Sequence, residues 1–434
     1  MPLSIRILLA LLLGVAAGAV LAATRFGGLE NVLSAADVIG TLWLNALRMT
    51  IIPLIFALVV TSINSAGETA SGGRLAARTL LVIFLLLAGG AILSMVVSPL
   101  LLAIWPLNGS NAQGLLQGIG SSTQEVAPAA PISEMITGLI PTNPVAAASE
   151  GAMLPFVFFT LVFGFAVSRL KRASRVQLTP VLNAVAETML IIIHWVLLLA
   201  PIGVFALAVR LGATGGASAA GALAHYVAIT TIMGVIATLV LYPLLLLRRM
   251  SVLRFAAGIA PAQVVAASTA SSLASLPIMI ERAQKSLGVP SAVAGLALPL
   301  AVTMMRYTSP FVNIAVGLWL AQLYGLEPTW IQIMAVGAAA IMGSIAAVGL
   351  PGGINLFITY VPICTVLGLP VEVLPLLLAV DAIPDISKTV GNVTADLTLA
   401  VLVTEPADVV VTEYPAAASA GAPSDTFEPV PDAA

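Results

Sequence analysis

Eight long apolar segments, separated by short polar stretches, limit how this chain can fold more than any other feature. Each is long enough to cross the hydrocarbon core of a bilayer, which takes roughly 20 helical residues. Within that core, only helices and closed barrels satisfy all of their backbone hydrogen bonds internally. The segments predict an all-α polytopic membrane protein with eight transmembrane helices, near residues 5–24, 37–64, 76–105, 145–168, 178–210, 219–247, 292–324 and 371–401.

The composition supports this class and argues against others. Hydrophobic residues make up 60% of the 434 positions, charged residues make up 8%, and the mean hydropathy is +1.10. A soluble protein of this composition would expose large apolar patches and aggregate. The net charge of −2 argues against a nucleic-acid partner, and the single Cys364 excludes an internal disulfide or a thiolate metal cluster.

Basic residues indicate the orientation in the membrane. Twelve of the 17 Lys and Arg lie in or near alternate short loops, whereas residues 105–153 contain none. Because positively charged loops stay inside, both termini are predicted to be cytoplasmic, in a bacterial-type inner membrane. Residues 7–23 are interpreted as a retained first span, with a signal-peptide core as the alternative. Residues 405–434 are predicted to form a disordered tail.

Two further apolar segments are interrupted in a way that favours re-entrant hairpins. Residues 255–286 are broken by a Ser-rich stretch and Pro277, and residues 328–366 are broken around Pro351. Each proline precedes a polar interruption in the next span by 30 residues, at Tyr307 and Asp381. Paired broken segments are typical of inverted-repeat transporters with a site near the membrane midplane. The alternative is that these are ordinary Gly- and Pro-containing membrane helices.

A polar stripe in the last span predicts what that site binds. Steps of three, four and seven residues place six polar side chains on one helix face, and charges at such a depth are costly unless they serve a function. The stripe predicts a site for a polar, charged solute. The six residues of the stripe are Asp381, Asp385, Lys388, Thr389, Asn392 and Asp396.

These motifs resemble the dicarboxylate/amino acid:cation symporters, the family that includes the glutamate transporters. The matching residues run in the family's order over roughly 5–401: Ile140 to Pro144, Ser271-Ser272 with Leu276-Pro277, Gly349 to Gly352, and Asp381 to Asp396. The resemblance implies a homotrimer and an elevator mechanism. It implies a scaffold of residues 5–64 and 133–213. It also implies a mobile transport domain of residues 76–105 and 219–401, with the second hairpin as its gate.

The resemblance also implies roles for individual residues. Asp385 would hold the amino group of a substrate, although an internal pair with Lys388 is the alternative. Thr389 and Asn392 would hold the substrate and its main-chain carboxylate. The hairpin tips and the first interrupted span would complete the substrate site, through Ser271, Ser272, Ser309, Leu350, Pro351, Gly352 and Gly353.

The sequence departs from the family pattern at the cation sites. Acidic-amino-acid members have Arg where this chain has Lys388, which offers a point contact instead of a planar fork. The family's Asn-Met-Asp-Gly-Thr signature aligns with residues 305–309, so Met305 and Tyr307 replace oxygen ligands of Na⁺. Partner ligands in the third span align with Ile83, Leu86 and Leu87. A second cation site persists at Thr303, Ser344, Ile345 and Ala347.

Charge counting turns these departures into a hypothesis about coupling. The family pattern has four carboxylates and one arginine, whereas Asp381, Asp385 and Asp396 here face Lys388 and Arg306. Arg306 would act as a tethered cation in place of Na⁺, with snorkelling to a polar edge as its alternative. The remaining net charge of −1 needs one further cation, a proton on an aspartate or one ion at the second site.

The resulting prediction is a secondary transporter of a small acidic or polar amino acid that needs no cofactor and does not depend on Na⁺. It would be coupled to H⁺ or act as an exchanger. The alternatives are a Na⁺-coupled amino-acid or dicarboxylate symporter and, in another class, an uncoupled anion channel or sensor. The chain has no phosphate-binding loop and no nucleophile constellation, which argues against ATP-driven transport and against an enzyme.

Overall fold

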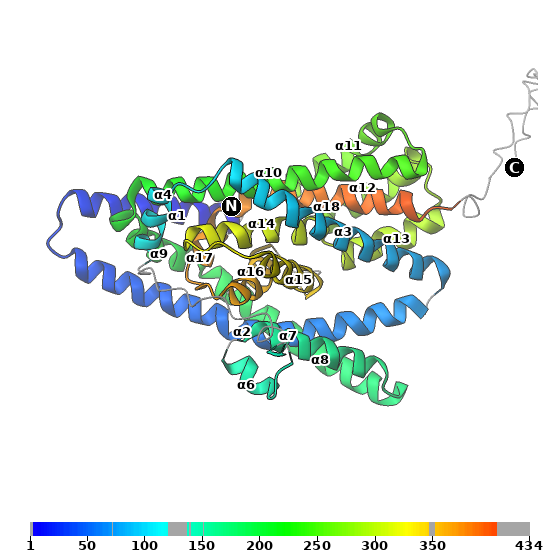
Figure 1. The fold of residues 1–434 in the computed structure, drawn as a ribbon, viewed down its shortest axis with the longest axis horizontal. Helices are drawn as coiled ribbons and strands as arrows, with labels where there is room; N and C mark the ends of the chain where they lie inside the picture. Colours follow the sequence, from blue (N-terminus) through cyan, green and yellow to red (C-terminus); the bar gives the residue numbers. More distant parts are fainter. Residues whose placement is uncertain are drawn as a thin grey trace, which may run out of the picture.

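The computed structural model describes residues 3–71, 73–119, 137–138, 140–150, 152–346 and 352–405. Every regular element in these ranges is a helix, which confirms the all-α fold class (Figure 1). The second-hairpin positions Ala347, Leu350 and Pro351 lie outside the described residues, and so does the tail beyond Glu405.

The long helices follow the apolar segments. Seven described helices are long and apolar enough to cross a membrane, and one of them is the first arm of a hairpin. The long or apolar helices outside the hairpins and the broken spans are α1 (Leu3–Ala23), α2 (Leu29–Ser71), α3 (Arg74–Ile104), α7 (Met153–Ser168), α8 (Arg172–Leu198), α9 (Ala200–Thr214) and α10 (Gly216–Leu244).

Three details differ from the sequence-based prediction. The segment 178–210 is not one span, because α8 ends at Leu198 and α9 starts just before Pro201, which occupies a first-turn position where proline is favourable. A short helix, α4 (Gly109–Gly118), was not predicted; the Asn108 side chain caps it by accepting from the Ser110 N–H. The predicted span 145–168 is also divided, because α6 (Pro144–Ser149) ends before α7 starts at Met153; the Asn143 side chain caps α6 by accepting from the Val145 N–H.

Both predicted hairpins are pairs of helices. The first consists of α11 (Val252–Thr269) and α12 (Ser272–Lys285), joined at Ala270, whose φ of 49° is left-handed. The second consists of α15 (Trp330–Ala346) and α16 (Gly352–Leu367). The span after each hairpin is interrupted, which gives α13 (Ser291–Met304) with α14 (Thr308–Leu323) and α17 (Leu374–Val380) with α18 (Ala382–Val403).

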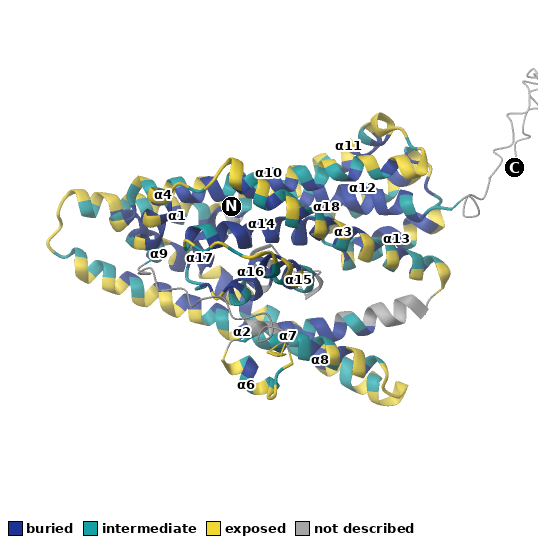
Figure 2. Ribbon diagram, in the orientation of Figure 1, coloured by how far each residue is buried: buried dark blue, intermediate teal, exposed yellow. Residues whose placement is uncertain are grey.

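The helices pack in two groups. In the first group, α9 packs against α1 and α2, and α2 packs against α7 and α8; the second group consists of α3, α10, the two hairpins, α13, α14 and α18. In Figure 1, α2, α7 and α8 lie along one side of the molecule, and α10, α14 and α18 lie side by side on the other. Figure 2 shows that α14 and the later part of α18 are largely buried, and most of the polar stripe is buried with them, namely Asp381, Thr389, Asn392 and Asp396.

Candidate substrate and ion site

The centre of the candidate site is an ion-pair cluster around Lys388. Its ammonium nitrogen lies 2.7 Å from Asp381 Oδ2 and 2.9 Å from Asp381 Oδ1, whereas Asp385 Oδ1 is 3.8 Å away. The Lys388 and Asp381 side chains are only 12% and 8% exposed. The internal pair of Lys388 with Asp385 is therefore present, but the tighter contact joins Lys388 to Asp381 across the interruption between α17 and α18.

Two tyrosines that were not among the predicted site residues complete this cluster. The Tyr226 hydroxyl of α10 donates to Asp381 Oδ1 at 3.1 Å and lies 3.4 Å from the Tyr360 hydroxyl of α16. Both rings are almost completely buried. Asp381 thus accepts from an ammonium and a hydroxyl, which satisfies a carboxylate that would otherwise be costly to bury.

Arg306 supplies a second positive charge to the same region. It lies in the three-residue interruption between α13 and α14, and it attracts the carboxylate of Asp385 electrostatically. Asp385 therefore has two cations near it, Lys388 and Arg306. Across these four residues the formal charges balance, as expected for ionic groups taken out of water.

Asn392 connects the two interrupted spans. Its Oδ1 accepts from both the backbone N–H and the hydroxyl of Thr308, each at 2.9 Å. The Thr308 hydroxyl also lies 3.1 Å from the Lys388 carbonyl. Thr389, one turn before Asn392, donates to the Asp385 carbonyl of its own helix, and Ser309 is buried beside Thr308. Thr308 was not among the predicted site residues.

The hairpin residues are described only in part. Ser271 caps α12 by accepting from the Ala274 N–H at 3.2 Å, and Ser272 is the first residue of that helix. The backbone N–H groups of such a first turn lack partners in the helix and attract anions. Gly352 and Gly353 open α16 in the second hairpin.

The residual cation-site residues have a mixed environment. Thr303 is exposed and donates to the Pro299 carbonyl of its own helix. Ser344 is buried and donates to the Ala340 carbonyl. Ile345 belongs to α15, and Ala347 falls outside the described residues. The two described hydroxyls are therefore held by their own helices.

Apolar packing occupies the place where the family pattern has its buried Na⁺ ligands. Met305 and Tyr307 are each 2% exposed and belong to the hydrophobic core. The Tyr307 ring packs against Gly90 of α3, where an added methyl group would lie only 3.0 Å from the ring. Ile83, Leu86 and Leu87 on α3 are also buried. These side chains offer no hard oxygen ligand except one phenol, so Na⁺ has a poor ligand set here.

Asp396 is the exception to the charge balance. It is fully buried, and neither of its carboxylate oxygens has a hydrogen-bond partner among the residues that the structure describes. Nearby hydroxyls are used elsewhere, since Thr394 and Thr398 donate to carbonyls of their own helix. A buried carboxylate without a partner requires a bound cation or a proton.

Paired helical hairpins around two interrupted spans, with a buried charged site between them, are typical of membrane transporters. The family model of the sodium:dicarboxylate symporter family matches residues 3–405. The chain therefore belongs to this family, and the resemblance seen in its motifs is confirmed.

Three relatives illustrate the range of the family. The chain is 28% identical over 419 residues to a proton/glutamate-aspartate symporter of Escherichia coli (strain K12), covering 92% of this chain and 91% of the relative. It is 26% identical over 383 residues to a proton/sodium-glutamate symport protein of Bacillus subtilis (strain 168), covering 85% of each. It is 29% identical over 398 residues to a C4-dicarboxylate transport protein of Anaeromyxobacter sp. (strain K), covering 90% and 86%.

Proposed function

We propose that this protein is a secondary active transporter of a small acidic or polar amino acid that works without the family's usual Na⁺ coupling. The observation that carries the proposal is the pairing of fixed charges. Lys388 and Arg306 balance Asp381 and Asp385, which leaves Asp396 as the uncompensated carboxylate among the site residues that the structure describes. One monovalent cation per substrate, a proton or a single Na⁺ at the residual site, would complete this balance.

The proposed substrate follows from Asp385 and Lys388. Asp385 offers a carboxylate for a substrate amino group, which favours an amino acid over a plain dicarboxylate. A substrate carboxylate would compete with Asp381 for the Lys388 ammonium, 2.7 Å away in this conformation. The similarity to a glutamate-aspartate symporter and to a C4-dicarboxylate transport protein supports an anionic substrate.

The movement that we propose is of the elevator type. Helices α1, α2, α7, α8 and α9 would form the scaffold of a homotrimer, and the group around α10, α14 and α18 would move as the transport domain. The packing of the helices in two groups supports this division. The distribution of Lys and Arg supports cytoplasmic termini in the bacterial inner membrane.

Uptake into proteoliposomes tests the coupling. We expect radiolabelled glutamate or aspartate to enter at the same rate when choline replaces Na⁺, and to be stimulated by an inward proton gradient if the coupling ion is H⁺. Counterflow without any gradient would indicate an exchanger. Uptake that stops in choline would contradict Na⁺ independence, and substrate-independent current without saturable uptake would favour the channel alternative.

Arg306 provides a second test of the charge argument. We expect Arg306→Met to reduce substrate uptake by at least tenfold, because it removes a positive charge beside Asp385. A tenfold effect corresponds to a loss of about 1.4 kcal/mol in binding. Arg306→Lys keeps the charge and serves as the matched control. Should Arg306→Met transport as well as the unmodified protein, the tethered-cation role would be wrong; uptake by this variant that newly requires Na⁺ would strongly support it.

A further inference from the structure

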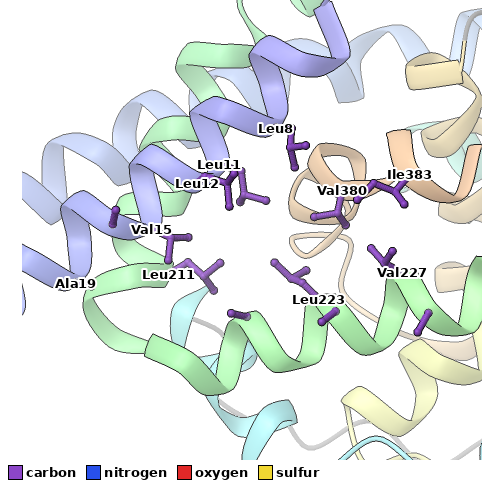
Figure 3. A pocket seen from close by; sticks show the side chains of 14 residues that line it. Leu8, Leu11, Leu12, Val15, Ala19, Leu211, Leu223, Val227, Val380 and Ile383 are labelled. Carbon is purple, nitrogen blue, oxygen red and sulfur yellow. The ribbon is translucent and has the colours of Figure 1, made fainter.

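An apolar cavity lies between the two helix groups, beside the α17–α18 junction that carries Asp381. Its volume is about 530 Å³, and its walls come from α1, α9, α10 and the junction of α17 with α18. Figure 3 shows side chains of α1, α10 and the α17–α18 junction pointing into the same space. Cavities of roughly 300–1,000 Å³ are large enough for small organic ligands.

The chemistry of the walls excludes a polar occupant. All fourteen lining residues are Leu, Val, Ile or Ala, so no lining side chain can donate or accept a hydrogen bond. Water is unfavourable in such a cavity because it needs two or more polar partners. An occupant of this cavity must therefore be hydrocarbon.

The cavity is open toward the membrane. Leu12 of α1 and Ile383 of α18 line it and are 57% and 47% exposed, whereas Leu211 and Leu223 at its inner wall are buried. Because α1 and α10 are long and apolar enough to cross a membrane, we expect the exposed surface at Leu12 to face lipid tails. The cavity thus runs from the lipid-facing surface into the protein interior.

We propose that this cavity binds one acyl chain of a bilayer phospholipid. The chain enters past Leu12 and Ile383 and reaches Leu211 and Leu223, so that it contacts both helix groups at once. Val380 and Ile383 flank Asp381, and Tyr226, which donates to Asp381, is the neighbour of the lining residue Val227. The bound chain therefore packs against the helices that position the charged cluster.

This location gives the lipid a role in transport, a step that rests on the proposed function. If the group around α10 moves relative to α1 and α9, the two walls of the cavity separate or slide. A chain that fills the cavity in this conformation then stabilises this conformation over the others, because a ligand shifts a conformational equilibrium only through its different affinity for each state.

Photolabelling tests the binding directly. The full-length protein is reconstituted with a phosphatidylethanolamine that carries a diazirine on one acyl chain, irradiated, digested and mapped by mass spectrometry. We expect labels at the buried positions Leu211 and Leu223 as well as on the exposed surface. Labels confined to exposed residues such as Leu12 and Ile383 would overturn the proposal.

Matched variants separate the cavity from the general lipid-facing surface. Ala224→Phe fills the cavity from α10 and Ala16→Phe fills it from α1; either should abolish labelling of Leu211 and Leu223. Val235→Phe adds the same ring to the exposed face of α10, eleven residues further along and outside the cavity, and should leave the labels unchanged. Unchanged inner labels in both cavity variants, each folded by size-exclusion chromatography, would contradict the site.

The binding result does not depend on the proposed function. Labelling of the inner wall without any amino-acid uptake would retain the lipid site and contradict only the transport proposal. Uptake with no inner-wall label would retain the transport proposal and contradict the lipid site. If both hold, Ala224→Phe should change the initial uptake rate relative to Val235→Phe, and equal rates would contradict the conformational role of the chain.

Discussion

Two helix pairs of this protein are packed by different means. Between α1 and α9 the backbones come so close that a methyl group at Gly18 or Gly212 would overlap a main-chain carbonyl of the facing helix. Between α10 and α18 the contact includes buried polar groups, among them the hydrogen bond from Tyr226 to Asp381. One pair depends on shape, and the other depends on satisfied charge.

The difference teaches what each pair can tolerate. Gly14 and Gly18 form a Gly-x-x-x-Gly stripe, the pattern by which membrane helices approach closely when lipid is as apolar as their side chains. Such packing fixes one arrangement and offers no group for a solute. The α18 stripe carries groups that a solute or ion can compete for, at the cost of being unstable whenever one partner is missing.

The largest expected effect comes from breaking the charged pair. Lys388→Met leaves Asp381 without its ammonium partner, and removing one partner of a buried ion pair costs about 3–5 kcal/mol. Chemical unfolding in detergent, followed by tryptophan fluorescence, should show this loss in the free energy of unfolding. Adding Asp381→Asn should restore part of it.

The matched control is an exposed pair on the first hairpin. Lys285 lies 3.0 Å from Glu281, with side chains 72% and 47% exposed. Lys285→Met should change the free energy of unfolding by only about 0.3–0.5 kcal/mol, because water already screens such a pair. Similar losses in the free energy of unfolding for the two lysine variants would show that Asp381 does not need the Lys388 ammonium to remain buried.

The sequence predicted the stripe but not the details of its pairing. Asp381 and Lys388 are seven residues apart and thus share a helix face, yet the only internal pair considered for Lys388 individually was the alternative one with Asp385, three residues away. The backbone at Asp381 keeps helical dihedral angles, and the long Lys388 side chain reaches back along the shared face to within 2.7 Å of Asp381 Oδ2. Hydropathy and Pro or Gly breaks were sufficient for the two hairpins and for most of the spans, but not for the divided segment 178–210.

Contacts between distant segments could not be predicted. Tyr226 and Tyr360 lie in apolar helices, where a tyrosine leaves no signal in the hydropathy pattern, and they reach Asp381 only through the fold. The division of 178–210 into α8 and α9 had a local signal, Pro201, that the length of the apolar segment obscured. Long-range partners need the tertiary structure, whereas breaks in helices need only the local residues.

An intermediate effect is expected from the shape-dependent pair. Gly212→Ala places a methyl group against the Val15 carbonyl, and a backbone atom cannot rotate away as a side chain does. Overpacking of this kind costs about 1–3 kcal/mol. Gly89→Ala on α3, where nothing lies within 4 Å of the added carbon, should be neutral or slightly stabilising. The comparison between helix pairs would fail if Gly212→Ala were as harmless as Gly89→Ala in the same unfolding measurement.

The smallest effect on stability is expected where the two helix groups meet through charge. Arg48 of α2 lies 2.9 Å from Glu372, just before α17, and the side chains are 36% and 42% exposed. A pair this accessible contributes about 0–1 kcal/mol. A double-mutant cycle of Arg48→Leu and Glu372→Gln should therefore give a small coupling energy in unfolding.

Under the proposed elevator movement the Arg48–Glu372 pair must separate in each transport cycle, so the same variants should change the uptake rate more than they change stability. A coupling energy well above 1 kcal/mol, with uptake unaltered, would instead make the pair part of the fixed packing.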